Sequence, residues 1–288
     1  MQKSFSLIRT LVATLTGSVA LLTATSGWAQ TADLLARVKS NKEITIATEA
    51  RYAPFESVEN GKIVGYDADL MQYVLKALPD VKVKQLDLPF QGLLPGLDAK
   101  RFDIVVTAVT INKDRASHFA FTVPVADATT GVLVRAGDKG IATPTDLNGK
   151  TVGSQTGSAQ LQALIALDKK LKADGGAGIK QIKQYVAFDE AYADLAVGRI
   201  DAVAQSVANL GPLMKARPGV FTILSQTIGP KTYFAWVGRK DADSAALVKL
   251  FSDGIARANR DGTMKQLQLK WFGSTMDVPA DAVPEPTM

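Results

Sequence analysis

The sequence predicts an α/β protein of two lobes, each a mostly parallel sheet flanked by helices. Short β-branched and apolar runs alternate with helical patterns along the chain, and this alternation is typical of βαβ units. The alternation falls into two series, each too short for one large α/β domain. The length of 288 residues agrees with two lobes, because a domain takes about 150 residues.

The first series covers residues 43–119. Its predicted strands are rich in β-branched and apolar residues and are Glu43–Thr48, Val81–Leu88 and Phe102–Val109. Its predicted helices include stripes of apolar residues at helical spacing and are Tyr66–Leu78, Phe90–Arg101 and Asn112–Phe119. Pro79 ends the first helix, and Pro95 weakens the middle of the second. The nearly continuous apolar run of the third strand predicts burial on both of its faces.

The second series begins near residue 129. Its predicted strands are Gly131–Arg135, Thr151–Gln155, Ile182–Ala187 and Ile200–Ala204. Its predicted helices are Ala159–Leu171, Phe188–Gly198 and Val207–Ala216, with a short helical turn near residue 145. A strand over Tyr233–Val237 and helices over Ser244–Asn259 and Met264–Trp271 complete the chain before a proline-rich tail, 277–288, that we expect to be frayed.

The order of these elements predicts that the chain crosses twice between the lobes. The last helices are most easily placed on the first lobe, which otherwise has few helices. We therefore expect residues 30–127 and 232–288 in lobe 1 and residues 128–231 in lobe 2. Ligands of open α/β sheets bind beyond the carboxyl ends of the strands, so we expect a cleft where those ends face each other.

Residues 1–29 are predicted to be a cleavable signal peptide. Lys3 and Arg9 give a positive start, the apolar stretch Leu11–Leu22 follows, and small residues end the segment at Ala29. A membrane anchor is the alternative, but this stretch is too short for a hydrocarbon core of about 30 Å. No later stretch reaches the ~18 apolar residues of a spanning helix. We expect export to the periplasm without a membrane anchor.

Composition excludes several classes of site. The absence of cysteine rules out disulfides, thiolate metal sites, a cysteine nucleophile and a lipid-modified N-terminal cysteine. With a single histidine, His118, we expect no metal site, and we expect no cofactor. The net charge of +5 falls to +3 once Lys3 and Arg9 are removed, and no cluster of basic residues indicates nucleic acid.

No catalytic motif is recognisable. The sequence lacks GxSxG, HExxH, GxxxxGK[ST] and GxGxxG. His118 is predicted on the surface or boundary of a short helix, although a Ser-His-Asp triad stays open. The carboxylate pairs Asp67/Asp69 and Asp189/Glu190 stand at helix starts, where they are expected to complement the helix dipole.

Polar groups at strand ends are the remaining candidates for binding. Thr107 and Thr110 lie at the end of a buried strand, and Arg115, a bidentate carboxylate donor, lies in the next helix. Gly157 and Ser158 stand where a strand enters a helix and offer free N–H groups to an anion. Two aromatic residues that follow strands, and could stack on a ligand, are Tyr52 and Phe90.

An ordered set of motifs resembles the periplasmic solute-binding proteins of polar amino acid ABC importers. The segments are Ile46–Phe55 (IATEARYAPF), Gly65–Leu70 (GYDADL), Phe90–Leu97 (FQGLLPGL), Phe102–Arg115 (FDIVVTAVTINKDR), Leu147–Gly153 (LNGKTVG) with Gly157-Ser158, Gly198–Ala202 (GRIDA) and Asn259–Thr263 (NRDGT). Each segment alone is a weak signal, but their order over nearly the whole mature chain is specific. The resemblance implies a type II periplasmic-binding-protein fold with two hinge crossings.

The resemblance also implies a solute site in the cleft. Arg115 would pair with a carboxylate of the solute, the aromatic pair would sandwich it, and Glu49 would read its side chain. The implied contact residues are Arg115, Thr110, Thr107, Ser158, Gly157, Tyr52, Phe90, Glu49 and Ser206. The implied partners are a small carboxylate solute and an inner-membrane ABC permease, and we expect a monomer.

One position departs from the family pattern. Ser206 stands where the family usually has an aspartate that holds the α-ammonium of the solute. A hydroxyl cannot neutralise an ammonium, and an unpaired buried charge is costly. Either Glu49 takes the ammonium, or the solute is not an ordinary α-amino acid.

Two functions follow from the resemblance. The first is non-catalytic binding of a carboxylate solute for import. The alternative is a periplasmic dehydratase acting on a cyclic carboxylate, in which Glu49 is the candidate general acid. A third role, as a sensor partner, is not separated by the sequence.

Overall fold

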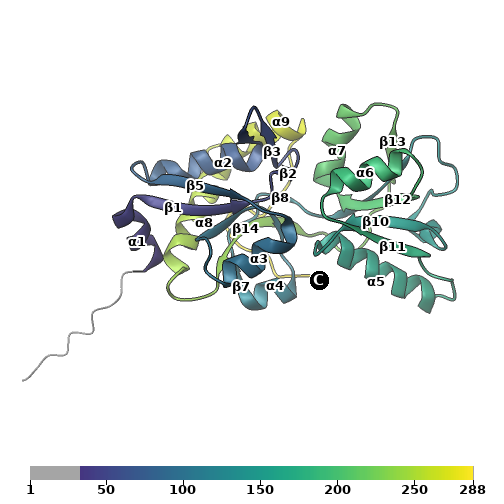
Figure 1. Cartoon of the computed structure of the whole chain (residues 1–288), viewed down its shortest axis with the longest axis horizontal. Coiled ribbons are helices and arrows are strands. Elements are labelled where there is room, and N and C mark those ends of the chain that lie inside the picture. Colours follow the sequence, from purple (N-terminus) through teal and green to yellow (C-terminus); the bar gives the residue numbers. More distant parts are fainter. Residues whose placement is uncertain (1–32, 288) are drawn as a thin grey trace, which may run out of the picture. The chain divides into compact units, whose positions relative to one another are not determined.

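The computed structural model describes residues 33–287, which belong to one compact unit (Figure 1). The predicted signal peptide, 1–29, lies outside the described residues. The chain begins with a helix missed by sequence, α1 (Leu34–Asn41), whose N-cap Asp33 accepts a hydrogen bond from the backbone N–H of Ala36. This helix packs on the first strand, β1, and on α8, a helix near the end of the chain.

The first sheet has the strand order β5-β1-β6-β14-β7, with β8 paired to β14. Its strands are β1 (Glu43–Thr48), β5 (Lys82–Asp87), β6 (Ile104–Thr110), β7 (Phe119–Phe121), β8 (Ala126–Asp127) and β14 (Tyr233–Arg239). The strands β5, β1 and β6 are parallel, and β14 runs antiparallel to β6. All seven residues of β6 are buried, as its continuous apolar pattern predicts.

The second sheet repeats this plan in the order β11-β10-β12-β9-β13. Its strands are β9 (Thr130–Arg135), β10 (Thr151–Gln155), β11 (Gln181–Tyr185), β12 (Ala202–Ser206) and β13 (Phe221–Ile223). The strands β11, β10 and β12 are parallel, and β9 runs antiparallel to β12. In each sheet the antiparallel strand is the first element after the chain has left the other sheet, because β9 follows β8 and β14 follows β13.

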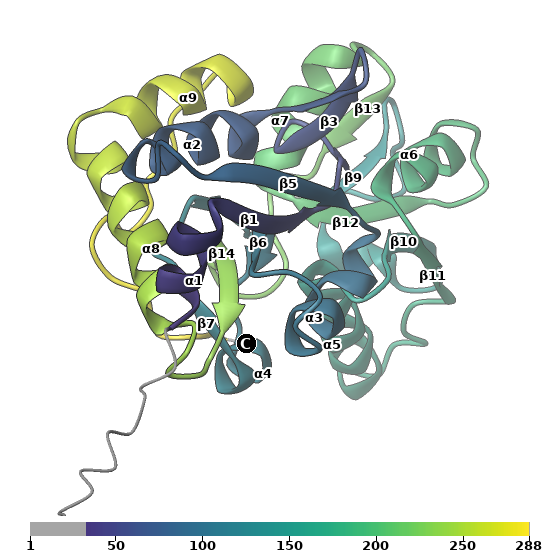
Figure 2. The same cartoon turned by 60° about the vertical axis from the view of Figure 1, so that its left-hand side comes forward.

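Helices cover both sheets (Figures 1 and 2). Those that contact the first sheet or pack on its helices are α1, α2 (Tyr66–Val74), a 3-10 turn over Leu75–Ala77, α3 (Phe90–Asp98), α4 (Lys113–His118), α8 (Ala245–Arg260) and α9 (Thr263–Phe272). The second sheet is contacted by α5 (Ala159–Ala173), α6 (Phe188–Ala196) and α7 (Val207–Ala216), and a 3-10 turn lies over Pro144–Leu147. The α/β class predicted from the sequence is confirmed.

A small three-stranded sheet was not expected. It joins β2 (Arg51–Tyr52), β3 (Glu56–Glu59) and β4 (Lys62–Val64) in antiparallel order. Asn60 and Gly61 connect β3 to β4 with φ of 50° and 73°, and an Asn-Gly pair with positive φ is typical of a type I′ hairpin turn. This sheet places Tyr52 beside the carboxyl end of β1.

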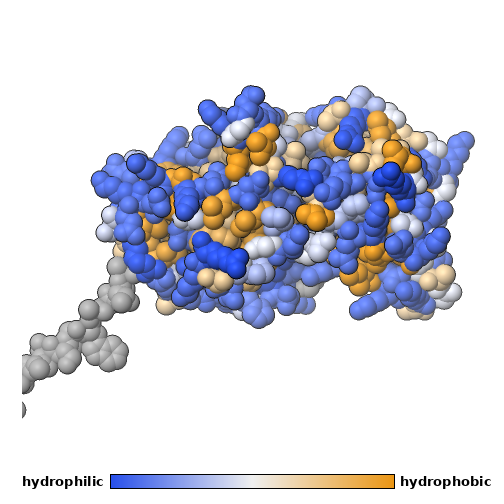
Figure 3. Space-filling view, in the orientation of Figure 1, coloured by the Kyte–Doolittle hydropathy of each residue, from blue (hydrophilic) through white to orange (hydrophobic). Residues whose placement is uncertain are grey.

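Polar side chains predominate on the part of the surface that Figure 3 draws. This face is hydrophilic over most of its area, with apolar residues among the polar ones.

The tail, residues 277–287, contains neither helix nor strand. Two contacts nevertheless involve it: Arg260 pairs with Asp281 at 3.1 Å, and Thr287 donates a hydrogen bond to the carbonyl of Lys231 at 3.4 Å. These two contacts are exposed, and the expectation of a frayed tail stays a prediction. Within residues 33–287, no helix has the length and apolar character needed to cross a bilayer.

Candidate functional site

Residues that follow β1 and β6 in the chain form hydrogen bonds with β12 and with α5, the helix that follows β10. Tyr52 donates its hydroxyl proton to Oε1 of Gln205 at 3.1 Å, and Asn112 donates from its amide to Oε1 of Gln162 at 3.1 Å. The ring of Tyr52 also lies 5.8 Å from that of Phe188. We call this region of contact between the strand ends of the two large sheets the seam. It lies where the sequence predicts a cleft.

Arg115 lies in this seam with only 5% of its surface exposed. Its helix is capped by Asn112, whose side-chain oxygen accepts a hydrogen bond from the N–H of Arg115 at 2.9 Å. The guanidinium donates to the carbonyl of Thr110 at 3.0 Å and, from the other sheet, to the carbonyl of Gly157 at 2.9 Å. The ring of Phe90 stands 5.4 Å from the guanidinium carbon.

No carboxylate of the described residues forms an ion pair with Arg115. Burial lowers its pKa to about 10, so the side chain still carries its charge at neutral pH. A buried cation held by neutral carbonyls favours an incoming anion, because a carboxylate would supply the missing counter-charge. A cavity of about 510 Å³ lies beside it, and its lining includes Phe90, Arg115 and Gly157 as well as the carboxylates of Asp98 and Asp114.

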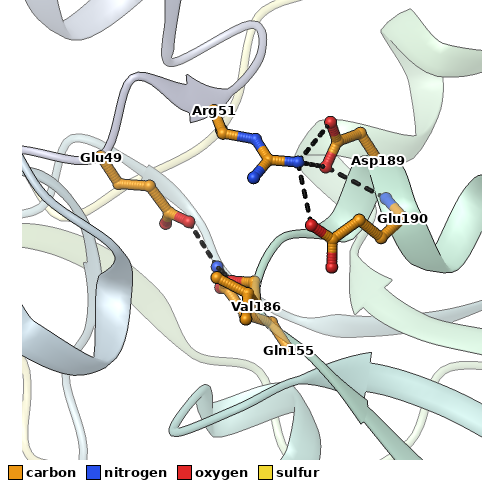
Figure 4. A network of polar contacts seen from close by, with 6 residues as sticks. All are labelled: Glu49, Arg51, Gln155, Val186, Asp189 and Glu190. Atoms are coloured by element: carbon orange, nitrogen blue, oxygen red, sulfur yellow. Dashed lines mark hydrogen bonds and ion pairs between the residues drawn. The ribbon is translucent and has the colours of Figure 1, made fainter.

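Glu49 lies at the end of β1 with 3% of its surface exposed (Figure 4). Gln155, at the end of β10, donates from its side-chain amide to Oε1 of Glu49 and to the carbonyl of Val186. The second carboxylate oxygen, Oε2, is buried and has no hydrogen-bond partner among residues 33–287. Burial raises the pKa of Glu49 to about 8, although the hydrogen bond from Gln155 works against this rise.

Arg51 joins the small three-stranded sheet to helix α6 at the rim of the site (Figure 4). Its guanidinium pairs with Asp189 at 2.8 Å and with Glu190 at 3.1 Å, both in the first turn of α6. The carboxylates that the sequence assigned to the helix dipole thus also hold a cation from the small sheet. About half of the Arg51 side chain is exposed, so this contact is a weak surface interaction.

Thr107 and Thr110 point to different partners. The hydroxyl of Thr107 donates to Oε2 of Glu56 at 3.0 Å, and the carbonyl of Thr110 accepts from Arg115. Thr48 also donates to Glu56, on Oε1, at 3.0 Å. A contact between Thr107 and a solute therefore stays a prediction that competes with an existing hydrogen bond.

Ser158 caps α5, as expected for a residue where a strand enters a helix. Its Oγ accepts from the N–H of Leu161 at 3.0 Å and donates to the carbonyl of Gln155 at 2.8 Å. Gly157 adopts φ of 76°, which glycine tolerates, and this turn aims its carbonyl at Arg115. These two residues lie at the seam, opposite the first sheet.

Ser206 is fully buried and its polar groups are satisfied by protein. Its hydroxyl donates to Oδ1 of Asn209 at 2.5 Å, and its N–H donates to Oε1 of Gln205 at 2.6 Å. Asn209 in turn donates a hydrogen bond, at 3.0 Å, to the carbonyl of Ala53, which lies between β2 and β3. No acidic group stands at this position, as the sequence shows.

Four polar residues that lie at the seam or beneath it were not singled out from the sequence. These are Gln155, Gln205, Asn209 and Glu56. Gln155 and Gln205 end buried strands, and a polar residue at that place was a usable signal. His118 is exposed, and no group of three or more metal-ligating side chains occurs among residues 33–287.

The fold is that of an α/β protein in which two large sheets meet at their strand ends, with the buried cation Arg115 at that place. The sequence profile of the bacterial extracellular solute-binding proteins, family 3, matches residues 44–274. The chain belongs to that family, which confirms the resemblance and the type II fold.

Three relatives illustrate the match. The L-cystine-binding protein TcyJ of Escherichia coli (strain K12) is 29% identical over 243 residues, covering 84% of this chain and 86% of that protein. An ancestral arginine-binding protein bound to arginine is 32% identical, with a TM-score of 0.70 over 81% of this chain and 99% of that one. An ancestral amino acid-binding protein described as a precursor of cyclohexadienyl dehydratase is 25% identical, with a TM-score of 0.71, covering 84% and 100%.

Proposed function

We propose that this protein binds an amino acid or a related carboxylate solute between its two sheets and delivers it to an inner-membrane ABC permease. The observation that carries the proposal is Arg115, a buried cation that donates to carbonyls of both sheets and has no acidic partner among the described residues. A bidentate carboxylate replaces those carbonyls favourably, because charge-assisted hydrogen bonds are stronger than neutral ones. The names of the relatives agree with such a solute.

The remaining contacts arrange the solute around that anchor. Phe90 already packs on the guanidinium and would cover one side of the solute, while Tyr52 closes the other end of the seam. Gly157 and Ser158 would offer groups from the second sheet, and Thr110 from the first. Thr107 would join only if its hydroxyl leaves Glu56.

The amine of the solute, if it has one, would be held by Glu49. Ser206 cannot hold it as a charged pair, because its hydroxyl is neutral and already donates to Asn209. Glu49 has a buried oxygen without a partner, which an ammonium or guanidinium would satisfy. A carboxylate solute without an α-amine stays compatible with this arrangement.

The proposal includes a location and a hinge. The protein would act in the periplasm as a monomer after removal of residues 1–29. Lobe 1 would consist of residues 30–127 and 232–288, and lobe 2 of residues 128–231. The solute would favour the closed arrangement by contacts that only this arrangement provides.

One observation favours an enzymatic alternative. Glu49 is a buried acid with a raised pKa, which suits a general acid, and one structural relative is described as a precursor of a dehydratase. We favour binding without catalysis, because nothing in the sequence adds a catalytic signature to Glu49. Turnover of prephenate or arogenate by the purified protein, lost in Glu49→Gln, would reverse this preference.

A thermal-shift screen of the mature chain against amino acids and non-amino carboxylates tests the proposed function. A solute at 100 times its Kd stabilises the protein by about 2.7 kcal/mol, which a melting curve resolves. We expect at least one carboxylate to raise Tm, and the matched carboxamide of that solute to leave Tm unchanged. Equal shifts from the carboxylate and its carboxamide, or no shift with any carboxylate, would contradict the proposal.

A further inference from the structure

Glu49 is surrounded by groups that leave a negative charge uncompensated. The neutral amide of Gln155 reaches only Oε1, and Oε2 has no partner. The carboxylate of Asp87 also faces Glu49, and it already accepts the N–H of Ala50 at 2.8 Å. The buried phenol of Tyr52 faces the same region and brings no positive charge.

Arg51 is the cation that stands nearest in sequence, and its charge is directed elsewhere (Figure 4). Its guanidinium pairs with Asp189 and Glu190 rather than with Glu49, so its charge is balanced by two carboxylates. Asp189 itself opposes ionisation of Glu49, whereas Arg51 favours it. Among residues 33–287, therefore, no cationic side chain forms an ion pair with Glu49.

An ionised carboxylate in such a place is costly, because one oxygen is buried without any donor. The group avoids that cost by holding a proton while no solute is bound. A solute cation changes the balance, since it supplies both a donor and a compensating charge for Oε2. A cavity of about 100 Å³ lies beside Glu49, lined by Arg51, Asp87 and Val186 among others, and offers space for a small cationic group.

We propose that Glu49 exchanges a proton for the cationic group of the solute, so that solute binding releases a proton and weakens as the medium becomes more acidic. This inference rests on the proposed function. It adds that the affinity for a cationic solute depends on pH, and that the affinity for a carboxylate lacking any cation does not.

The proton count is measured by titration calorimetry of the full mature chain at pH 7, in phosphate and in Tris buffer. The probes are lysine, norleucine and hexanoate, which differ stepwise by one amine, together with any solute found by the thermal-shift screen. The dependence of the binding enthalpy on the ionisation enthalpy of the buffer gives the number of protons released. We expect about one proton for each solute whose amine reaches Glu49 and none for hexanoate.

The pH profile gives a second readout on the unmodified protein. Burial places the pKa of Glu49 at about 8, so the association constant of the cationic solute should fall by up to about tenfold per pH unit below that value. In Glu49→Gln we expect proton release to vanish and the remaining affinity to become independent of pH. Glu190→Gln, an exposed member of the same network, is the matched control and should release protons as the unmodified chain does.

The outcomes separate the two proposals. Binding of a cationic solute without proton release at pH 6 and pH 7 would overturn the exchange and leave the proposed function standing. Proton release that persists in Glu49→Gln would also overturn it. Failure of every carboxylate to bind would instead contradict the proposed function.

Discussion

Glu56 and Asp67 form a buried carboxyl pair beneath the strand ends. Their exposed fractions are 1% and 0%, and both Asp67 oxygens lack a hydrogen-bond partner within the described part of the chain. Burial and the mutual repulsion of the two groups raise the pKa of Glu56 well above its usual range, and burial raises that of Asp67 to about 7. Within the pair, Glu56 accepts hydrogen bonds from Thr48 and Thr107, so it couples the strands β1 and β6 to the small three-stranded sheet.

This pair predicts a loss of stability as the pH rises from acidic to neutral values. The folded state keeps protons that the unfolded chain releases near pH 4, so stability falls as pH rises from about 4 through 7. Asp67→Asn removes one of the two charges, and we expect it to raise stability at pH 8 by on the order of a few kcal/mol while changing little at pH 4. Urea unfolding at both pH values measures this, with the exposed Asp80→Asn as control. An equal effect of Asp67→Asn at the two pH values would contradict it.

At the residue scale, the sequence singled out positions along the chain but did not predict which way their side chains point. Thr107 and Thr110 are three residues apart on one strand, and side chains alternate between faces, so they cannot share a face. That alternation was readable and explains why Thr107 reaches Glu56 instead of the seam. The hydrogen bond from Gln155 to Glu49 was not readable, because it joins strands of different sheets.

The small three-stranded sheet is the element that most affects the site without belonging to either large sheet. Its strand β2 positions Tyr52 and Arg51, and its turn residue Gly61 follows Asn60, a hairpin signal that sequence analysis passed over. Its strands are two to four residues long, too short for an alternating pattern to stand out. Apart from the missed helix α1, the longer strands and helices were predicted to within a few residues of their ends.

Gly65 joins this small sheet to α2 and predicts a steric effect. Its φ is 137°, and a Cβ added there would lie 2.1 Å from the carbonyl oxygen of Phe55. Gly65→Ala should therefore cost more than about 2 kcal/mol of unfolding free energy. Gly61→Ala is the matched control, since its φ is 73° but nothing lies within 4 Å of its added Cβ. Chemical denaturation measures both, and a similar loss in the two variants would exclude the clash.

At the scale of the whole molecule, two sheets of the same plan meet at their strand ends. The sequence predicted this from the alternation of elements and from the carboxyl-end rule. It could not predict which groups meet across the seam, because those pairs depend on how the two sheets approach each other. Arg115 was singled out from the sequence as an anion-binding residue, and it lies buried with its guanidinium on the carbonyl of Gly157, while its role toward a solute stays a prediction.

The most direct test of the account is the affinity of Arg115→Ala for the solute that the thermal-shift screen identifies. Calorimetry should show a loss of at least about thirtyfold, because removal of one partner from a buried charge pair costs roughly 2–5 kcal/mol. Arg115→Lys should retain part of the affinity, as an ammonium supplies charge without the planar fork. Arg101→Ala, at an exposed position, should bind as the unmodified chain does. A folded Arg115→Ala protein with unchanged affinity would contradict the central claim.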